Sequence, residues 1–423
     1  MKDWFKVSAL LCAYGLLRET RPSDPYLTEL LFSESKNYTL EEYYRDAIPI
    51  GTYSYLAQLV IVFLITDFFK YKPLIILSGL VGSIIWGTIA LAKTLLELQV
   101  LIGIYGTTFA TEVAYFTYIY AKVDKKYYPK VTSHTRAALL VGKLVSSISS
   151  QILLYFQLMN YTGLNYITVA AQAASTIWAL FLPNVKTTVY FHRKESVDGK
   201  LSKQESTNDI NLKNTTSSSE CIIPPKRKQN PFKLIYVHFK NAYTNRGVIQ
   251  WSILYATLLC GNLLIYSYIQ SLWKEIEINP TIAWNGIVEA ILAFLGCLSA
   301  LSAGYLHGGR LSNTSSLLII STLSICKGCV VLLLALPKDL YSAYAGYAIF
   351  GAIYAFSITV CGSEVARHLE EDSFGLIFGI NTFVALLLQT VLTILVVNGS
   401  VFLLDIYGQF LIYAGQDGAH SGK

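Results

Sequence analysis

Glu112 is the residue whose type and position most clearly indicate chemistry, because it lies in the middle of the apolar segment 97–121. A charge in the middle of a bilayer costs roughly 2.5–3.5 kcal/mol on insertion scales, so such a side chain faces a cavity or the interior of a helix bundle. Thr108 and Tyr115 share a helical face with Glu112. A carboxylate beside aromatic rings suits a nitrogen-rich cation. Glu112 is therefore either a residue that contacts the substrate or one member of a structural ion pair with Lys143.

Lys143 is a second charge inside an apolar segment, 136–158, where its neighbours are small or apolar. Two interpretations remain open. In the first, Lys143 forms a structural ion pair with Glu112, and the pair has no direct role in binding. In the second, Lys143 meets an anionic group of the substrate, which makes it a candidate binding residue.

Two apolar segments carry polar stripes with helical spacing. In 247–272 the stripe is Asn262, Tyr266 and Gln270, and in 374–397 it is Asn381, Gln389 and Thr393. Such stripes either line the path of a solute or join helices through hydrogen bonds, and the pattern alone favours neither role. On the first interpretation, the candidate binding residues are Asn262, Tyr266 and Gln389.

Three further acidic residues lie within or beside apolar segments. Glu289 and Glu364 are weaker candidates for the substrate path. Asp67 precedes a Lys-rich turn, 70–72, between two apolar segments. At that turn a gating salt bridge is more plausible than substrate contact.

The composition excludes an ordinary soluble protein. Of 423 residues, 53% are hydrophobic and only 14% are charged, whereas soluble domains carry about 25% charged residues. The same figures exclude a disordered chain, and seven scattered cysteines do not form a disulfide scaffold.

The apolar segments predict an all-α membrane protein. A helix needs about 20 apolar residues to cross a bilayer, and eleven segments meet that requirement: 4–20, 48–68, 73–92, 97–121, 136–158, 162–183, 247–272, 282–306, 313–335, 340–364 and 374–397. A twelfth, 401–415, is short, because 15 residues rise only about 22 Å as a helix. We therefore expect a truncated twelfth helix followed by a polar tail, 416–423.

Charge places the N-terminus in the cytoplasm. With that orientation, 23 Lys and Arg residues lie inside and 7 outside, as the positive-inside rule requires. Asn37 then falls in the first long outside loop as a glycosylation acceptor. The polar stretch 184–246 reads as a flexible cytoplasmic linker between an N-terminal bundle, 1–183, and a C-terminal bundle, 247–415. This six-plus-six arrangement is typical of the major facilitator superfamily.

The sequence contains no P-loop, catalytic triad or HExxH motif. We expect neither an enzyme nor a cofactor or metal, and we expect transport to be driven by a gradient. The expected partners are a small molecule and the lipid bilayer, without nucleic acid.

Several motifs, in order along the chain, resemble solute carrier family 19, the reduced folate and thiamine transporters. They are Tyr14-Gly15, Arg21-Pro22-Ser23-Asp24-Pro25-Tyr26-Leu27, Tyr53-Ser54-Tyr55-Leu56, Leu64-Ile65-Thr66-Asp67, Glu112-Val113-Ala114-Tyr115, Asn285-Gly286, Val288-Glu289-Ala290-Ile291, Ala343-Tyr344-Ala345-Gly346-Tyr347 and Phe378-Gly379-Ile380-Asn381-Thr382-Phe383. The resemblance implies uptake of a vitamin across the plasma membrane by alternating access.

The resemblance also indicates the branch. Folate carriers are basic at the position of Glu112 and have lysine at that of Gln389, so this chain looks like the thiamine branch. That branch implies that Glu112 contacts the aminopyrimidine end of thiamine and that Tyr115 stacks nearby. Asp24 matches an acidic residue found in both branches. The alternatives are a reduced folate or other organic anion, a shared pocket for pyridoxine, and a truncated isoform that binds or regulates without transporting.

The chain departs from the thiamine branch at two positions. Gly51 and Lys143 stand where members of that branch carry aromatic residues. The loss of two rings thins the expected stacking cage, and Lys143 adds a positive charge near a cationic ligand.

Overall fold

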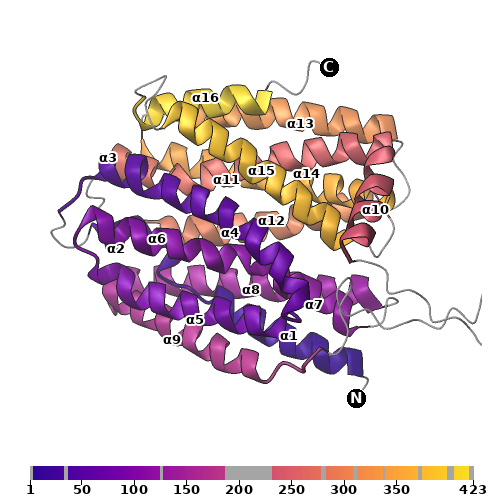
Figure 1. The fold of residues 1–423 in the computed structure, drawn as a ribbon. Helices are drawn as coiled ribbons and strands as arrows, with labels where there is room; N and C mark the ends of the chain where they lie inside the picture. The colour runs from indigo at the N-terminus through magenta and orange to yellow at the C-terminus, as the bar shows by residue number, and fades with distance from the viewer. Residues whose placement is uncertain are drawn as a thin grey trace, which may run out of the picture.

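The predicted apolar segments form helices that run side by side along one axis (Figure 1). The structure is a computed structural model, and it describes residues 3–32, 37–123, 127–185, 231–277, 283–307, 313–336, 339–369, 374–397 and 404–418. Helices are the regular elements of these ranges, and no strand occurs in them.

The first half of the chain contributes seven long helices. They are α1 (Asp3–Glu19), α4 (Ile48–Phe68), α5 (Lys72–Thr88), α6 (Leu95–Ala110), α7 (Glu112–Lys122), α8 (Tyr128–Tyr155) and α9 (Tyr161–Leu180). Shorter turns join them: η1 (Asp24–Tyr26), α2 (Leu27–Leu31), α3 (Leu40–Glu42), η2 (Tyr43–Ala47) and η3 (Ile89–Leu91).

The second half contributes α10 (Pro231–Thr244), α11 (Arg246–Ile276), α12 (Asn285–His307), α13 (Asn313–Leu334), α14 (Leu340–Arg367), α15 (Phe374–Val396) and α16 (Ile406–Gly418). The two halves pack together through α8 against α12 and through α4 against α15.

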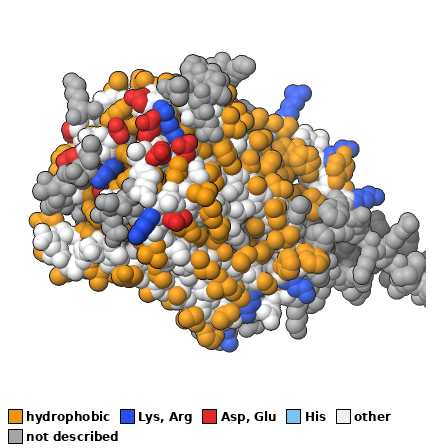
Figure 2. Space-filling model, turned by 60° about the vertical axis from the view of Figure 1, so that its left-hand side comes forward, with side chains coloured by type: hydrophobic (Ala, Val, Ile, Leu, Met, Phe, Trp, Pro, Cys, Tyr) orange, Lys and Arg blue, Asp and Glu red, His pale blue; other side chains and the backbone are white. Residues whose placement is uncertain are grey.

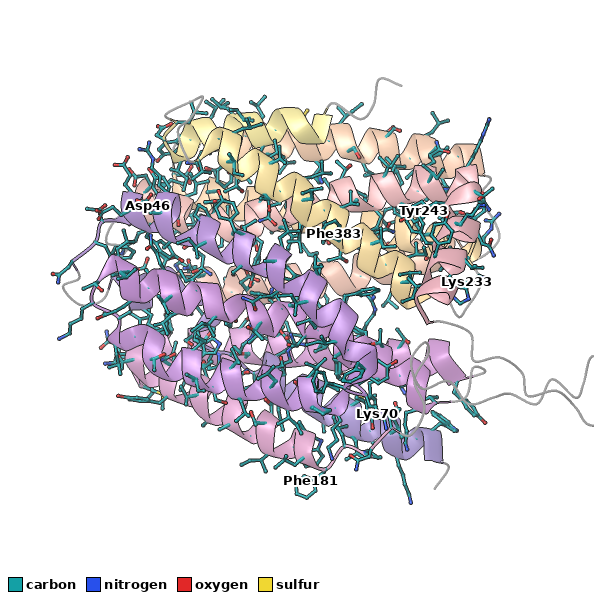
Figure 3. All side chains as sticks on the ribbon, viewed as in Figure 1. Asp46, Lys70, Phe181, Lys233, Tyr243 and Phe383 are labelled. Carbon is teal, nitrogen blue, oxygen red and sulfur yellow. The ribbon has the colours of Figure 1, made fainter. Side chains whose placement is uncertain are left out.

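We name the two ends of the bundle after labelled residues. The Asp46 end lies on the left of Figures 1 and 3, and the Lys70 end lies on the right. Local sequence sets where helices begin. At the Asp46 end the Thr94 side chain accepts from the backbone N–H of Glu97, and the Glu97 side chain returns the contact, which completes a capping box. At the Lys70 end, Lys70 and Tyr71 adopt positive φ angles of 60° and 66° in the tight turn before α5.

The predicted segment 97–121 is two helices, not one. The break falls at Thr111, whose hydroxyl donates to the Thr107 carbonyl at 2.7 Å. Ala114 then donates its backbone N–H to the carbonyl of Thr111 at 3.0 Å, a shorter-range bond than the α-helical pattern. Threonine side chains that bond to the preceding turn bend helices. Glu112 therefore becomes the first residue of α7.

The surface suits a bilayer. Hydrophobic side chains cover most of the face in Figure 2, while charged side chains gather at the ends. Within the described residues, eight helices are long and apolar enough to cross a membrane. Three predicted spans fall outside that set: α1 has 17 residues, 97–121 is interrupted, and α9 carries polar residues such as Asn165 and Gln172.

Two predicted boundaries differ from the structure. The predicted linker 184–246 contains α10 in its last part, and the remainder, from 186 to 230, lies outside the described residues. The short apolar run 401–415 forms α16, which begins at Ile406 and continues to Gly418, into the predicted tail. The division of the chain into two bundles at these boundaries stays a prediction.

Candidate functional site

A cavity of about 230 Å³ lies within the first half, and we call it the main cavity. Its lining comes from α1, α5, α6, α7, α8 and α9 together with the segment that follows α1: Arg18, Glu19, Arg21, Ser78, Trp86, Tyr105, Thr108, Phe109, Glu112, Leu139, Leu140, Lys143 and Gln172. The structure thus brings Glu112 and Lys143 to one cavity, as their positions within apolar segments predicted. Its wall carries both aromatic rings and charged groups, which suits a site for a small organic ion.

Glu112 forms its ion pair with Arg18 of α1. The carboxylate Oε2 lies 3.4 Å from Arg18 Nη2, and Arg18 also donates to the carbonyl of Thr108 at 3.3 Å. The Arg18 side chain is 11% exposed, whereas that of Glu112 is 39% exposed. The guanidinium is therefore held by the protein, while the carboxylate keeps an open face toward the cavity.

Lys143 pairs with Glu289 of the second half, so the structure contradicts the first of the two interpretations, a structural ion pair between Lys143 and Glu112. The Lys143 ammonium lies 2.9 Å from Glu289 Oε2 and 5.5 Å from the centre of the Tyr266 ring. Glu289 is buried, and its Oε1 accepts a hydrogen bond from the Tyr347 hydroxyl at 3.0 Å. The Lys143 side chain reaches across to α12, which packs against α8, and this contact directs its charge away from Glu112.

A second, smaller cavity of about 10 Å³ adjoins the main cavity and shares Glu19, Arg21 and Lys143 with it. Its lining joins the two halves: Glu19, Arg21, Asp24, Pro25, Lys143, Ser146, Ser147, Tyr266, Gln270 and Glu289. Three of the predicted binding residues, Asp24, Lys143 and Tyr266, therefore lie here, and the Tyr266 hydroxyl donates to Asp24 Oδ2 at 3.4 Å.

Arg21 links the carboxylates of this smaller cavity. Its Nη2 lies 2.8 Å from Glu19 Oε2 and 3.6 Å from Asp24 Oδ2. Burial tends to lower the pKa of the Arg21 guanidinium, which follows the first span, but the charges of Asp24 and Glu19 raise it well above its ordinary value. Arg21 therefore stays a cation, and it holds both carboxylates in place.

The structure does not bring Tyr115 to either cavity. Its side chain is 1% exposed, its hydroxyl donates to the backbone carbonyl of Leu11 at 3.0 Å, and its ring lies 5.4 Å from that of Tyr14. The helical spacing correctly put Tyr115 close to Glu112 along the chain, but the neighbouring helix α1 covers its ring. The stacking role predicted for Tyr115 does not match this packing.

Gln389 and Asn262 also lie away from both cavities. Gln389 is buried, and its Nε2 donates to Thr52 Oγ1 at 3.3 Å, which joins α15 to α4 across the two halves. Asn262 is half-buried on α11, one turn before Tyr266. For the Gln389 stripe, the structure favours the helix-joining interpretation over the solute path.

Two predictions on other residues stay predictions. The side chain of Asp67 lies outside the described residues, so its gating salt bridge has no structural counterpart here. Asn37 is exposed, and its backbone N–H donates to the carbonyl of Lys93 at 3.0 Å. This exposure is compatible with glycosylation.

Sequence reasoning missed Arg18, Glu19 and Arg21 as site residues, because it counted the two arginines only as charges outside the spans or at their ends and did not consider Glu19. The signal was present: Arg18, Glu19, Arg21 and Asp24 place opposite charges close together directly after an apolar segment. Such a cluster at a span end points into a bundle when its members neutralise one another.

The fold agrees with that of solved transporters. The chain superposes on the POT family transporter PepTSo with a TM-score of 0.67 and 10% identity, covering 99% of this chain and 96% of that one. The D-xylose–proton symporter gives a TM-score of 0.64 at 10% identity, with 99% and 97% covered. These likenesses confirm the predicted major facilitator fold.

Sequence comparison gives the family. Residues 2–412 match the family described as reduced folate carrier. Folate transporter 1 of Caenorhabditis elegans is 35% identical over 98% of this chain and 89% of its own length. Human thiamine transporter 1 is 35% identical over 97% and 87%, and human thiamine transporter 2 is 30% identical over the same shares. The resemblance inferred from the motifs is confirmed: the chain belongs to the reduced folate carrier family of membrane transporters.

Proposed function

We propose that this protein carries thiamine, or a closely similar organic cation, across the plasma membrane by alternating access. The observation that carries the proposal is the charge of the site. Around the two cavities stand three cations and four carboxylates, namely Arg18, Arg21 and Lys143 against Glu19, Asp24, Glu112 and Glu289. An excess of carboxylate attracts a cationic ligand.

Glu112 is the carboxylate best placed to receive that ligand. Its side chain is 39% exposed, against 16% for Glu19, 19% for Asp24 and 4% for Glu289. Its contact with Arg18, at 3.4 Å, is also longer than the 2.8 Å contact of Glu19 with Arg21. The rings of Tyr105 and Phe109 on the cavity wall, not Tyr115, then supply the aromatic contact for the ligand.

A lysine beside the site would repel a cationic substrate, but Lys143 is paired with Glu289. Because Glu289 neutralises Lys143 in this conformation, the main cavity receives little net repulsion from it. The pair also ties α8 to α12, so its formation depends on how the two halves are packed. We infer that Lys143 is a gating residue and not a direct contact of the substrate.

The orientation follows from the charges at the two ends. Basic side chains stand at the Lys70 end in Figure 2, which fits a cytoplasmic face. The Asp46 end then faces outward. There the halves meet through an ion pair between Lys274 and Glu29 at 2.7 Å and through a hydrogen bond from Asn285 Nδ2 to the Pro25 carbonyl at 3.0 Å. These contacts support a conformation that is closed toward the outside.

A second candidate is a reduced folate or another organic anion. Three cations line the main cavity, and one of them, Lys143, is held by a single carboxylate. If substrate releases Lys143 from Glu289, the cavity gains a positive charge suited to an anion. The 35% identity to a folate transporter is compatible with this alternative.

The Glu112→Gln variant tests the proposal. It keeps the size of the side chain and removes the charge. Replacing a charge-assisted contact by a neutral one costs about 2 kcal/mol, so the concentration of thiamine giving half-maximal uptake should rise roughly 30-fold. The measurement is uptake of labelled thiamine in cells, normalised to the amount of protein at the surface.

Glu41→Gln is the matched control, because Glu41 pairs with Arg45 at the Asp46 end and its side chain is 58% exposed. That variant should transport like the wild type. Thiamine uptake that is equal in Glu112→Gln and Glu41→Gln would contradict the role of Glu112.

A further inference from the structure

Helix α10 differs in direction from the rest of the bundle. In Figure 1 it stands across the Lys70 end, transverse to the long helices that would cross the membrane. It packs against α11 and α15. A helix transverse to membrane spans lies along the plane of the bilayer, at the level where the spans end.

The last turn of α10 is fixed to the bundle. Ala242 is buried, and the Tyr243 hydroxyl donates to Asn381 Oδ1 of α15 at 3.1 Å. At the end of α10, Asn245 accepts from the backbone N–H of Gly247 and so caps α11. The helix is therefore held in place by both of its neighbours.

The turns of α10 that precede its last turn carry large exposed apolar side chains beside lysines, and the ring of one of them, Phe239, lies 4.9 Å from that of Tyr243. Tyr236 is 61% exposed, Phe239 is 41% exposed and Val237 is 38% exposed, and Lys233 and Lys240 are exposed as well. Tyr236 is three residues from Lys233 and from Phe239 and four from Lys240, so these four side chains are neighbours on the helix surface. Figure 3 shows Lys233 and Tyr243 on this helix.

We propose that α10 is an interfacial membrane anchor: Tyr236 and Phe239 enter the boundary between headgroups and acyl chains, and Lys233 and Lys240 bind anionic lipid headgroups. An exposed aromatic flank next to a basic flank is the pattern of helices that lie on a membrane. Lysines near the surface of an anionic leaflet contribute about 1 kcal/mol each. The aromatic rings explain insertion, and the lysines explain a preference for anionic lipid.

Two observations favour a bilayer over a protein partner as the surface that α10 contacts. The spans α11 and α15, against which α10 packs, end beside it, so the exposed side of α10 lies where the bilayer surface must be. Two other basic side chains at the same end, Lys72 and Lys122, are engaged with the protein, because they donate to the carbonyls of Leu180 and Asn184. Lys233 and Lys240, by contrast, point their charge outward on an exposed face.

Photocrosslinking in nanodiscs tests this inference. The full chain carries p-benzoylphenylalanine at position 236 or 239 and is placed in nanodiscs of phosphatidylcholine with about one-third phosphatidylserine. Mass spectrometry identifies the adducts. We expect lipid adducts at both positions, with phosphatidylserine enriched over its share of the bilayer by up to about fivefold per lysine, the equivalent of 1 kcal/mol. The same label at Leu301, which is 71% exposed on α12, is the positive control for lipid contact, and at Glu41 it is the negative control.

Two results would overturn the inference. In the first, the label at Leu301 gives lipid adducts, but the labels at positions 236 and 239 give no adducts or adducts to another protein. That result would show that α10 is not a membrane anchor. Lipid adducts whose phosphatidylserine enrichment survives in the Lys233→Gln/Lys240→Gln variant would overturn the role of the lysines. The test does not depend on the substrate, so its failure would leave the proposed transport function untouched.

Discussion

The two halves of the molecule contribute differently to the site. Every residue that lines the main cavity comes from the first half, including Glu112 and Arg18. The second half supplies Tyr266, Gln270 and Glu289, and it supplies them to the smaller cavity, where the halves meet. On the proposed function, this difference leads us to propose that the first half selects the ligand and that the second half closes over it. The predictions below change one side of this comparison at a time.

The largest effect is expected from Glu289→Gln. Removing one partner of a buried ion pair costs about 3–5 kcal/mol when the remaining charge is fully buried. Because the Lys143 side chain is 28% exposed, we expect the free energy of unfolding to fall by about 2 kcal/mol. The freed Lys143 charge should also weaken thiamine binding. Thermal unfolding and thiamine binding of the purified protein measure the two effects.

The exchanged variant Lys143→Glu/Glu289→Lys sharpens this test. It keeps the pair between α8 and α12 but moves the positive charge into the second half. We expect it to recover stability and to bind thiamine at least as well as the wild type. If the exchange restores neither property, the pair does not act as a unit and the assigned division between the halves is wrong.

A smaller effect is expected from Lys274→Gln, which removes the ion pair with Glu29 at the Asp46 end. Both side chains are about one-tenth exposed, at 11% and 12%, so we expect the free energy of unfolding to fall by about 2 kcal/mol, as for Glu289→Gln, and the smaller total effect comes from the ligand. Thiamine affinity should change little, because neither residue lines a cavity. Labelling of a cysteine introduced at Ser147 by an impermeant reagent added outside should become faster. An unchanged rate of labelling together with a large loss of thiamine affinity would contradict this account, because Lys274 would then act on ligand binding and not on the contact between the halves.

The smallest effect is expected from Tyr115→Phe. This change removes the hydrogen bond to the Leu11 carbonyl and leaves the ring in place. The free energy of unfolding should fall by about 1 kcal/mol, and thiamine uptake per molecule at the surface should be unchanged. A selective loss of uptake would restore the substrate contact that the sequence predicted for Tyr115.

The sequence predicted the helices well because their signal is local. Long apolar segments, proline near the start of α4, α5 and α8, and capping residues such as Thr94 mark spans and their ends without knowledge of the fold. Glu112 was also identified from local information, since a charge in an apolar segment stands out. The interruption at Thr111 was missed because a threonine that bonds to the preceding turn looks like any other threonine in the sequence.

The partners of these residues were not predictable in the same way. Arg18 and Glu112 are 94 residues apart, and Lys143 reaches Glu289 in the other half of the chain. Periodicity tells which face of a helix a residue occupies, but not which helix covers that face. Tyr115 shows this limit: it lies one turn from Glu112, yet α1 covers its ring. Gln389 shows it too, because its stripe faces Thr52 of α4.

The central claim, that Glu112 and the excess of carboxylates over cations around the two cavities taken together select an organic cation, is tested most directly by measuring uptake of labelled thiamine and of a labelled reduced folate side by side in cells that display the protein at their surface. The account predicts saturable thiamine uptake that unlabelled reduced folate does not inhibit. Folate uptake without thiamine uptake would contradict it, because Lys143 and the two arginines would then outweigh Glu112 in choosing the ligand.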